Sequence, residues 1–262
     1  MSDPHVEAWF AYLAQRNRSP ETLKTYRSVM RHYPLDPLAV TPQQAETWWA
    51  GRDHLAIKTR QRTLSCVRSF YKWSMRFDYL DRDPTRRLDP PTQGKRLPKP
   101  MARADMLKVL AAAPPDLYRA IALGGYAGLR VAEVAALDWE LVDTEAMRII
   151  VRGKGDNDRP VGLSLLLLDA LLPNTGGNVV TAGGTPYTAG ALQRRANRLI
   201  TSVGVPGTFH KLRARYATVA LASTGNLLAV SRALGHSQTS TTALYALTAD
   251  TDLDLIAEAV TR

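Results

Sequence analysis

Two arginines in the second half of the sequence each have a polar partner three positions away, on the same face of an expected helix. Arg130 comes two residues after Gly128, near an expected helix start, and Glu133 follows at i+3 on the same helical face, where its carboxylate can orient the guanidinium. His210 and Arg213 are again i and i+3, so both can address one phosphate. The simpler alternatives are a surface Arg–Glu pair, which contributes little, and a helix with scattered basic residues.

Three further side chains could transfer a proton or act as a nucleophile. Lys154 lies between two glycines in an expected turn, where it can reach into a groove, although most lysines in turns are simply exposed. His236 follows Gly235, and Tyr245 comes nine residues after His236; a half-buried core aromatic is the commoner role of a helical tyrosine. Each signal is weak alone, but together they give the order Arg, Lys, His-x-x-Arg, His, Tyr.

This order of residues resembles that of the tyrosine recombinases, the phage-integrase family of site-specific recombinases. Four segments of the second half of the chain carry the resemblance, and two segments of the first half add softer matches. The segments are YAGLRVAEVAALDW (126–139), RGKGDNDRPVGL (152–163), FHKLRARYATVAL (209–221) and LGHSQTSTTALY (234–245), with SPETLKTYRS (19–28) and TLSCVRSFYKW (63–73) in the first half. Nearly the whole chain is covered.

The resemblance implies that these side chains meet at one scissile DNA phosphate. Tyr245 is then the nucleophile that forms a 3′-phosphotyrosyl link, while Tyr216 is a rival that lacks the Leu-Gly-His context. Arg130 and Arg213 clamp the non-bridging oxygens, and Glu133 supports Arg130 from behind. Fixed cationic donors suit this reaction because negative charge develops on the equatorial oxygens. The covalent link conserves the bond energy, so we expect no need for ATP, a cofactor or a metal.

The same resemblance assigns the proton transfers. His210 assists proton transfer at the tyrosine, since a free tyrosine has a pKa near 10 and must lose its proton during attack. His236 donates a further hydrogen bond to the phosphate, and Lys154 protonates the leaving 5′-oxygen, which is a strong base. The hairpin that carries Lys154 departs from the family's commoner form, because Pro160 and Gly162 stand in its return strand. That departure could shift the lysine.

The charge of the chain predicts a polyanionic partner. The 262 residues carry 34 Lys and Arg against 24 Asp and Glu, a formal net charge of +10. Residues 1–100 hold 18 of these basic and 10 of these acidic residues, a net +8, and residues 101–262 hold only +2. A basic block of this kind favours nucleic acid as the partner. A solvated basic surface without a partner is the alternative.

Several classes of protein are disfavoured by the composition. The single cysteine, Cys66, excludes an intramolecular disulfide and any Cys-based metal site, and it fits a reducing compartment. The longest apolar stretch, around Leu165–Leu168, is too short for a membrane span of about 20 residues. The start of the sequence has no signal-peptide pattern. We therefore expect a soluble, intracellular protein without a membrane partner. The resemblance to tyrosine recombinases implies the cytoplasm of a bacterial host cell, in association with the nucleoid.

The proline-rich residues 89–100 predict a linker between a helical core DNA-binding domain (1–88) and a catalytic domain (101–262). In the first domain, Ser19-Pro20 and Thr41-Pro42 are helix starts, and a third helix is expected over Lys58–Phe77. A basic stripe on this helix suits a groove lined by phosphates, although an ordinary amphipathic helix explains it too. The predicted DNA-binding residues are Lys58, Arg60, Arg62, Arg68, Lys72 and Arg76, with Lys95 and Arg96 in the linker.

The second domain is expected to begin with helices over 104–113 and 117–127 and to continue with a β-hairpin. Its strands would be Met147–Arg152 and Arg159–Leu163, on either side of a Gly/Asn/Asp cluster. The predicted fold is therefore mainly α with a small antiparallel β-sheet: an α-helical core-binding domain followed by an α+β tyrosine-recombinase catalytic domain. The tail, 246–262, is expected to form a short amphipathic helix that packs on a neighbouring subunit or on its own domain.

The predicted function is site-specific recombination by a phage integrase that joins phage and host attachment sites. The expected partners are double-stranded attachment-site DNA, three further copies of the chain in a homotetramer and an accessory directionality factor. An Xer-like resolvase of chromosome or plasmid dimers is the alternative within the family. A catalytically silent DNA-binding protein on the same fold and a type IB topoisomerase-like enzyme are the alternatives outside it.

Overall fold

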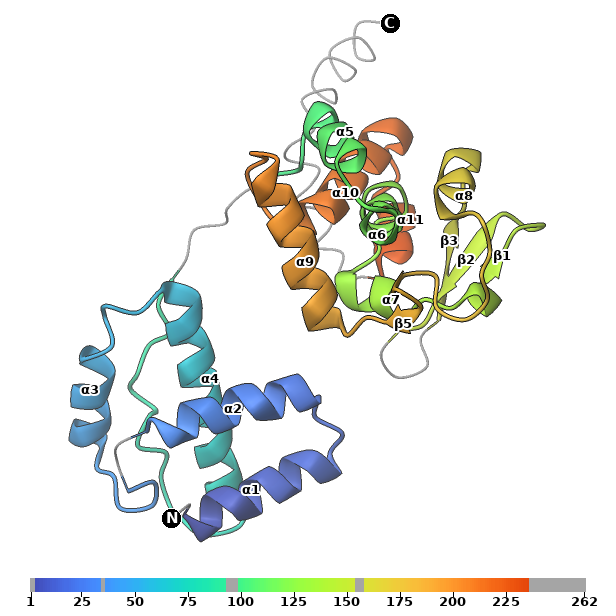
Figure 1. Ribbon diagram of the computed structural model, residues 1–262. Helices are drawn as coiled ribbons and strands as arrows, with labels where there is room; N and C mark the ends of the chain where they lie inside the picture. Colours follow the sequence, from blue (N-terminus) through green and yellow to red (C-terminus); the bar gives the residue numbers. More distant parts are fainter. Residues whose placement is uncertain (1–2, 34–35, 93–98, 154–157, 236–262) are drawn as a thin grey trace, which may run out of the picture. The chain divides into compact units, whose positions relative to one another are not determined.

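The chain divides into two compact units, Met1–Lys95 and Arg96–Arg262 (Figure 1). The structure is a computed structural model, and it describes residues 3–33, 36–92, 99–153 and 158–235. Several predicted residues therefore lie outside the described residues, and so does the predicted tail helix. These residues are Lys95, Arg96, Lys154, His236 and Tyr245.

The described part of the first unit contains four helices. The first three each begin with a proline, whose missing N–H costs nothing at the start of a helix. The residues before these prolines are Asp3, Ser19 and Thr41, and each side chain accepts a hydrogen bond from a backbone N–H of the first turn. The helices are α1 (Pro4–Gln15), α2 (Pro20–Arg31), α3 (Pro42–Ala50) and α4 (Ile57–Arg76).

Aromatic side chains fill the core of this unit. Trp9 of α1 and Phe70 of α4 are fully buried and meet edge to face, with ring centroids 5.5 Å apart. The buried hydroxyls of Tyr33 and Tyr71 lie 3.0 Å apart and satisfy each other. One face of α4 is buried and packs into this core: Leu64, Val67, Phe70, Tyr71 and Ser74.

The second unit is organised around α6, which lies in the middle of its helices (Figure 1). The buried run Ala120–Gly125 makes α6 apolar on almost every side, and α6 packs against α5, α7, α8, α9 and α10. No helix among the described residues is long and apolar enough to cross a membrane. The helices are α5 (Arg103–Ala111), α6 (Pro115–Tyr126), α7 (Val131–Ala136), α8 (Leu165–Leu171), α9 (Ala189–Ser202), α10 (His210–Thr224) and α11 (Leu227–Leu234), with a 3₁₀ turn at Trp139–Leu141.

A three-stranded antiparallel sheet in the order β1-β2-β3 completes the second unit. The predicted hairpin is confirmed as β2 (Arg148–Val151) and β3 (Arg159–Gly162), and the short β1 (Val142–Asp143) was not predicted. Pro160 and Gly162 take the outward positions of β3, and all four residues of the strand still pair with β2. A small hairpin, β4 (Thr181–Ala182) and β5 (Thr185–Pro186), precedes α9. The predicted fold class is confirmed.

The aromatic core of the first unit allows a matched test of stability. We expect Phe70→Ala to lower the free energy of unfolding by roughly 3–5 kcal/mol, because it removes a fully buried ring. Phe77→Ala, at a ring that is 46% exposed, should cost no more than about 1 kcal/mol. Tryptophan fluorescence in urea reports mainly on this unit, because four of the five tryptophans lie in it. Equal losses for the two variants would contradict the assignment of the core.

Candidate active site

Arg130 is positioned by the junction between α6 and α7. It occupies the N-cap of α7 with extended backbone, and its backbone N–H donates to Glu133 Oε2 at 2.7 Å. Its guanidinium bends back to the same carboxylate, with 2.8 Å between Nη1 and Oε1. The side chain remains 43% exposed. Glu133 therefore holds the guanidinium of Arg130, which stays partly exposed; the i, i+3 spacing predicted this pairing but not the exposure.

Glu133 collects two more guanidiniums, from distant segments. Arg159 at the start of β3 donates through both terminal nitrogens, each at 3.0 Å from a carboxylate oxygen. Arg213 of α10 lies 3.8 Å from Glu133 Oε2. The Glu133 side chain is only 10% exposed, and burial alone would raise its pKa. The hydrogen bonds from Arg159 and Arg130 outweigh burial and hold the pKa of Glu133 below its ordinary value.

The same three arginines cap the end of α11. The last carbonyl groups of a helix lack partners inside the helix, and positive charge is favourable at this end. Three successive carbonyl oxygens each accept from a different guanidinium, immediately before position 236. The donations run from Arg159 Nε to Ala233 O at 2.8 Å, from Arg213 Nη2 to Leu234 O, and from Arg130 Nη2 to Gly235 O at 3.1 Å.

Two glycines let the backbone approach this cluster closely. Gly128 has φ +67°, and its carbonyl oxygen accepts from Arg213 Nη1 at 2.6 Å. A Cβ on Gly128 would lie 2.4 Å from the ring of Tyr216, and a Cβ on Gly235 would lie 2.9 Å from Arg159 Nη1. Neither neighbour is a freely movable surface group. We infer that a larger residue at position 128 would displace Tyr216, and that a larger residue at position 235 would displace Arg159.

Arg213 faces inward in the described chain. Its side chain is 2% exposed, and its hydrogen bonds to the two backbone carbonyls join the end of α6 to the end of α11. His210 is the first residue of α10 and is exposed, one turn before Arg213. The structure thus brings Arg130, Glu133 and Arg213 together, as predicted. The roles given to these residues and to Lys154, His210, His236 and Tyr245 stay predictions.

Arg159 is the member of the cluster that the sequence analysis missed. In the sequence, Arg159 is marked only as the first residue of the return strand, yet it is 9% exposed and lies on the buried face of β3 with Val161. Residues i and i+2 of a strand share a face. A charged residue on the same strand face as an apolar valine therefore indicated, from the sequence alone, that it must have a hydrogen-bonding or acidic partner inside the protein.

The six predicted DNA-binding residues of α4 fall into two groups. Arg60 pairs with Asp53, with 2.6 Å between Nη2 and Oδ1, and lies over the Trp49 ring. Arg68 donates to the carbonyl of Leu88. These two arginines are half-buried and engaged inside their own unit. The other four are exposed and share one face of the helix: Lys58, Arg62, Lys72 and Arg76.

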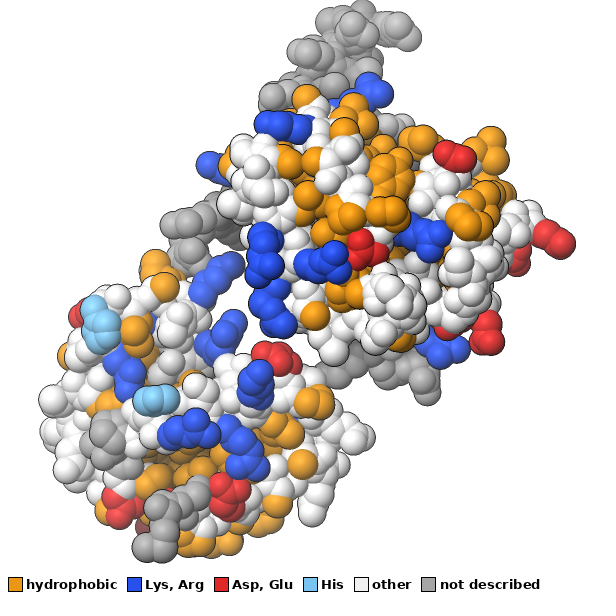
Figure 2. All heavy atoms as spheres, in the orientation of Figure 1, with side chains coloured by type: hydrophobic (Ala, Val, Ile, Leu, Met, Phe, Trp, Pro, Cys, Tyr) orange, Lys and Arg blue, Asp and Glu red, His pale blue; other side chains and the backbone are white. Residues whose placement is uncertain are grey.

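Further basic side chains lie on elements that the prediction of DNA-binding residues did not include. Figure 2 shows Lys and Arg gathered over α2 and α4 of the first unit and over α9 of the second. On α2, Lys24, Arg27 and Arg31 line one shallow pocket. On α9, Arg194, Arg195 and Arg198 are exposed. Both helices therefore carry positive charge on the surface, in addition to the predicted stripe of α4.

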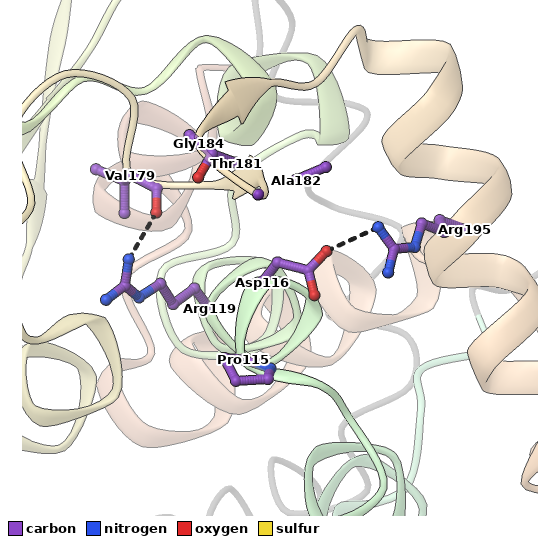
Figure 3. Close-up of a pocket in the computed structure, with 9 residues that line it drawn as sticks. Pro115, Asp116, Arg119, Val179, Thr181, Ala182, Gly184 and Arg195 are labelled. Carbon is purple, nitrogen blue, oxygen red and sulfur yellow. Dashed lines mark hydrogen bonds and ion pairs between the residues drawn. The ribbon is translucent and has the colours of Figure 1, made fainter.

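A pocket of about 500 Å³ lies elsewhere in the second unit, between the start of α6, the β4–β5 hairpin and α9 (Figure 3). Asp116 and Arg195 meet across it at 3.0 Å, and Arg119 donates to Val179 O at 3.2 Å. Tyr187 donates its hydroxyl to Asp116, and burial together with that carboxylate raises the pKa of Tyr187 to about 12. These groups bind one another and connect α9 to α6. No described residue of the predicted catalytic set lines this pocket.

The site suits the stabilisation of a negatively charged group. Three guanidiniums surround one carboxylate, so the cluster keeps a net positive charge around a preorganised, partly exposed Arg130. Such fixed cationic donors are what a phosphoryl-transfer reaction requires. Within the described residues, no group of three or more His, Cys, Asp and Glu side chains is placed to hold a metal ion.

Comparison with known families agrees with this fold. The model described as "Phage integrase family" matches residues 103–251, and the model described as "Phage integrase, N-terminal SAM-like domain" matches residues 6–77. The chain belongs to the phage integrase family, the tyrosine recombinases. It is an enzyme of the class that cleaves and rejoins DNA.

Similar proteins span almost the whole chain. The tyrosine recombinase XerC of Alcanivorax borkumensis is 29% identical over 93% of this chain and 91% of its own length. The tyrosine recombinase XerA of Thermococcus kodakarensis is 30% identical over 94% of this chain and 92% of its own. A lambda integrase tetramer bound to a Holliday junction superposes with a TM-score of 0.78 at 16% identity, covering 92% of this chain and 76% of that one. This last likeness concerns the fold.

The depressed pKa of Glu133 predicts how stability changes in acid. A carboxyl group with a lowered folded pKa stabilises the fold above its unfolded pKa, ordinarily 4.5, and this contribution is lost as the pH falls through the folded value. We expect the melting temperature of the wild type to fall more between pH 5 and pH 3 than that of Glu133→Gln. Glu140→Gln, at an exposed glutamate, is the control and should follow the wild type. Parallel curves for wild type and Glu133→Gln would contradict the role of the arginines.

Proposed function

We propose that the chain is a site-specific DNA recombinase that cuts and rejoins double-stranded DNA through a 3′-phosphotyrosyl intermediate. The observation that carries the proposal is the arginine cluster around Glu133, which joins residues between positions 128 and 235 into one cationic site. Membership of the tyrosine recombinase family supplies the reaction class. A silent DNA-binding protein would not need a buried carboxylate that orients an exposed guanidinium.

The reaction begins at the phosphorus atom. The Tyr245 oxygen forms a bond to phosphorus while the bond to the 5′-oxygen breaks, and the reverse reaction with a new 5′-hydroxyl rejoins the strand. The guanidinium of Arg130 stabilises the charge on the non-bridging oxygens, supported by the positive charge of Arg213 behind it. Glu133 keeps Arg130 in a fixed orientation, so little reorganisation is needed as charge develops.

Three side chains move or hold protons in the proposed reaction. His210, one turn before the arginine of α10, assists removal of the phenolic proton, and His236 donates a hydrogen bond to the phosphate. Lys154 gives a proton to the leaving 5′-oxygen, which would otherwise depart as an alkoxide. Every proton taken up by one group is returned in the rejoining step, so no net proton is consumed.

Basic helices bind the DNA backbone in this proposal. The exposed row of α4 and the basic residues of α2 contact phosphates, which makes affinity fall steeply with salt. The fold shared with the lambda integrase tetramer on a Holliday junction supports assembly of this chain as a homotetramer on DNA. An accessory directionality factor belongs to the integrase alternative. In either case the enzyme acts on DNA at the nucleoid of a bacterial cell.

An Xer-type role is the finer proposal. Relatives named XerC and XerA match more than nine-tenths of this chain at 29–30% identity, so their lengths also agree. This favours recombination between two copies of one site, which reduces a circular dimer to monomers. Integration of a phage genome, the role predicted first from the sequence, is the alternative, and it requires two different attachment sites.

A covalent adduct tests the nucleophile. We expect the wild-type chain to form an SDS-resistant complex with a nicked site duplex in the presence of EDTA. Tyr245→Phe should bind the same duplex within about twofold of the wild-type affinity yet form no adduct, because only the attacking oxygen is lost. Tyr216→Phe is the matched control and should retain the adduct. An adduct that persists in Tyr245→Phe would assign the nucleophile elsewhere.

The choice between resolution and integration can be read from the DNA substrate. Sequencing of host DNA trapped in the adduct identifies the bound site. We expect a plasmid with two direct copies of that site to be resolved into two circles by the chain. Recombination that occurs only between this site and a second, different site would instead establish the integrase role.

A further inference from the structure

Arg159 is buried, whereas an arginine in a β-hairpin is ordinarily exposed to solvent. It is 9% exposed, and it occupies the first inward position of β3, paired with Val151 of β2. Its two terminal nitrogens bind the two oxygens of Glu133, each at 3.0 Å. This bidentate geometry fixes the plane of the carboxylate as well as its position.

The remaining donor of Arg159 reaches a third segment. Nε donates to Ala233 O at 2.8 Å, at the end of α11, and the guanidinium packs where a Cβ on Gly235 would stand. One side chain thus connects β3, which follows the 154–157 segment, to the carboxylate on α7 and to the last turn of α11. These are the elements that adjoin the positions of Lys154, Arg130 and His236 in the sequence.

We propose that Arg159 is a positioning residue for the cleavage reaction, which holds Glu133 in the orientation that aligns Arg130; its bond to the end of α11 anchors Arg159 itself. The inference rests on the proposed function, because it assigns Arg130 to the scissile phosphate. Arg159 itself does not touch the reacting atoms. It acts through Glu133, and its effect must therefore disappear when Glu133 can no longer be oriented by a charge.

The alternative is an ion pair that only stabilises the fold. Both readings allow a loss of stability when Arg159 is replaced, since a buried carboxylate loses two hydrogen bonds. They differ in the folded enzyme bound to DNA. A stabilising pair leaves the cleavage rate of the folded, saturated enzyme unchanged, whereas a positioning residue changes that rate and leaves the affinity for DNA intact.

The first experiment separates rate from affinity. Arg159→Met and Arg159→Lys are compared with Arg148→Met, an exposed arginine on the neighbouring strand, on a nicked duplex at saturating protein. We expect Arg159→Met to cleave roughly 10- to 100-fold more slowly, because a small misalignment of the guanidinium is costly. Arg159→Lys keeps the charge but not the fork, so its rate should lie between. The affinity of all three should stay within about twofold of the wild type, and Arg148→Met should cleave at the wild-type rate.

A double-mutant cycle tests whether Arg159 influences the cleavage rate through Glu133. In the Glu133→Gln background, Arg159→Met should change the cleavage rate by less than about threefold, because the two residues act as one unit. Circular dichroism selects the folded variants. If Arg159→Met does not fold, the slower cleavage of folded Arg159→Lys at unchanged affinity decides the question.

The inference is overturned if folded Arg159→Met or Arg159→Lys cleaves at the wild-type rate when saturated with DNA. A loss of affinity in proportion to the loss of rate, or a full additional loss in the Glu133→Gln background, would overturn it as well. Failure of the wild-type chain itself to form an adduct points instead to the proposed function. The two failures are therefore distinguishable in the same set of reactions.

Discussion

The largely buried carboxylate of Glu133 is the group on which the catalytic unit depends. A carboxylate with so little contact with water is stable only when cationic groups and hydrogen bonds replace its hydration. Arg130, Arg159 and Arg213 provide them from three different elements, and each of these guanidiniums also needs acceptors. The requirement to satisfy one buried charge thus determines where the α6–α7 junction, β3 and α10 meet.

The end of α11 provides the further hydrogen-bond acceptors that the three guanidiniums need. The three arginines find their further acceptors in three successive carbonyl groups, at Ala233, Leu234 and Gly235. Those groups would otherwise lack partners at a helix terminus, and they concentrate partial negative charge there. The carboxylate of Glu133 and the end of α11 therefore bind the same three guanidiniums. Because only one full negative charge faces three positive ones, the cluster stays positive and can attract an anion at the exposed Arg130.

The two units divide the tasks of the enzyme. The first has an aromatic core and carries most of the excess charge of the chain on exposed helix faces, as an electrostatic surface for a polyanion requires. The second builds its site from the apolar α6 outward, with α9 connected to α6 by the Asp116–Arg195 pair. Affinity for a polyanion therefore depends on exposed basic side chains, whereas the alignment of the reacting groups depends on side chains that are packed and hydrogen-bonded.

Local signals in the sequence determined the parts of this protein that depend on neighbouring residues. Proline after a capping side chain marked the starts of α2 and α3, and the i, i+3 spacing placed Glu133 beside Arg130. Only the tertiary structure decided that Arg159 and Arg213 share that carboxylate, since their partners lie 26 and 80 positions away in the chain. Which face of a strand is buried depends on how the sheet packs against the core. Which cations contact a helix end depends on how distant segments of the chain pack. For that reason the sequence indicated the chemistry, while packing selected which arginines hold it in place.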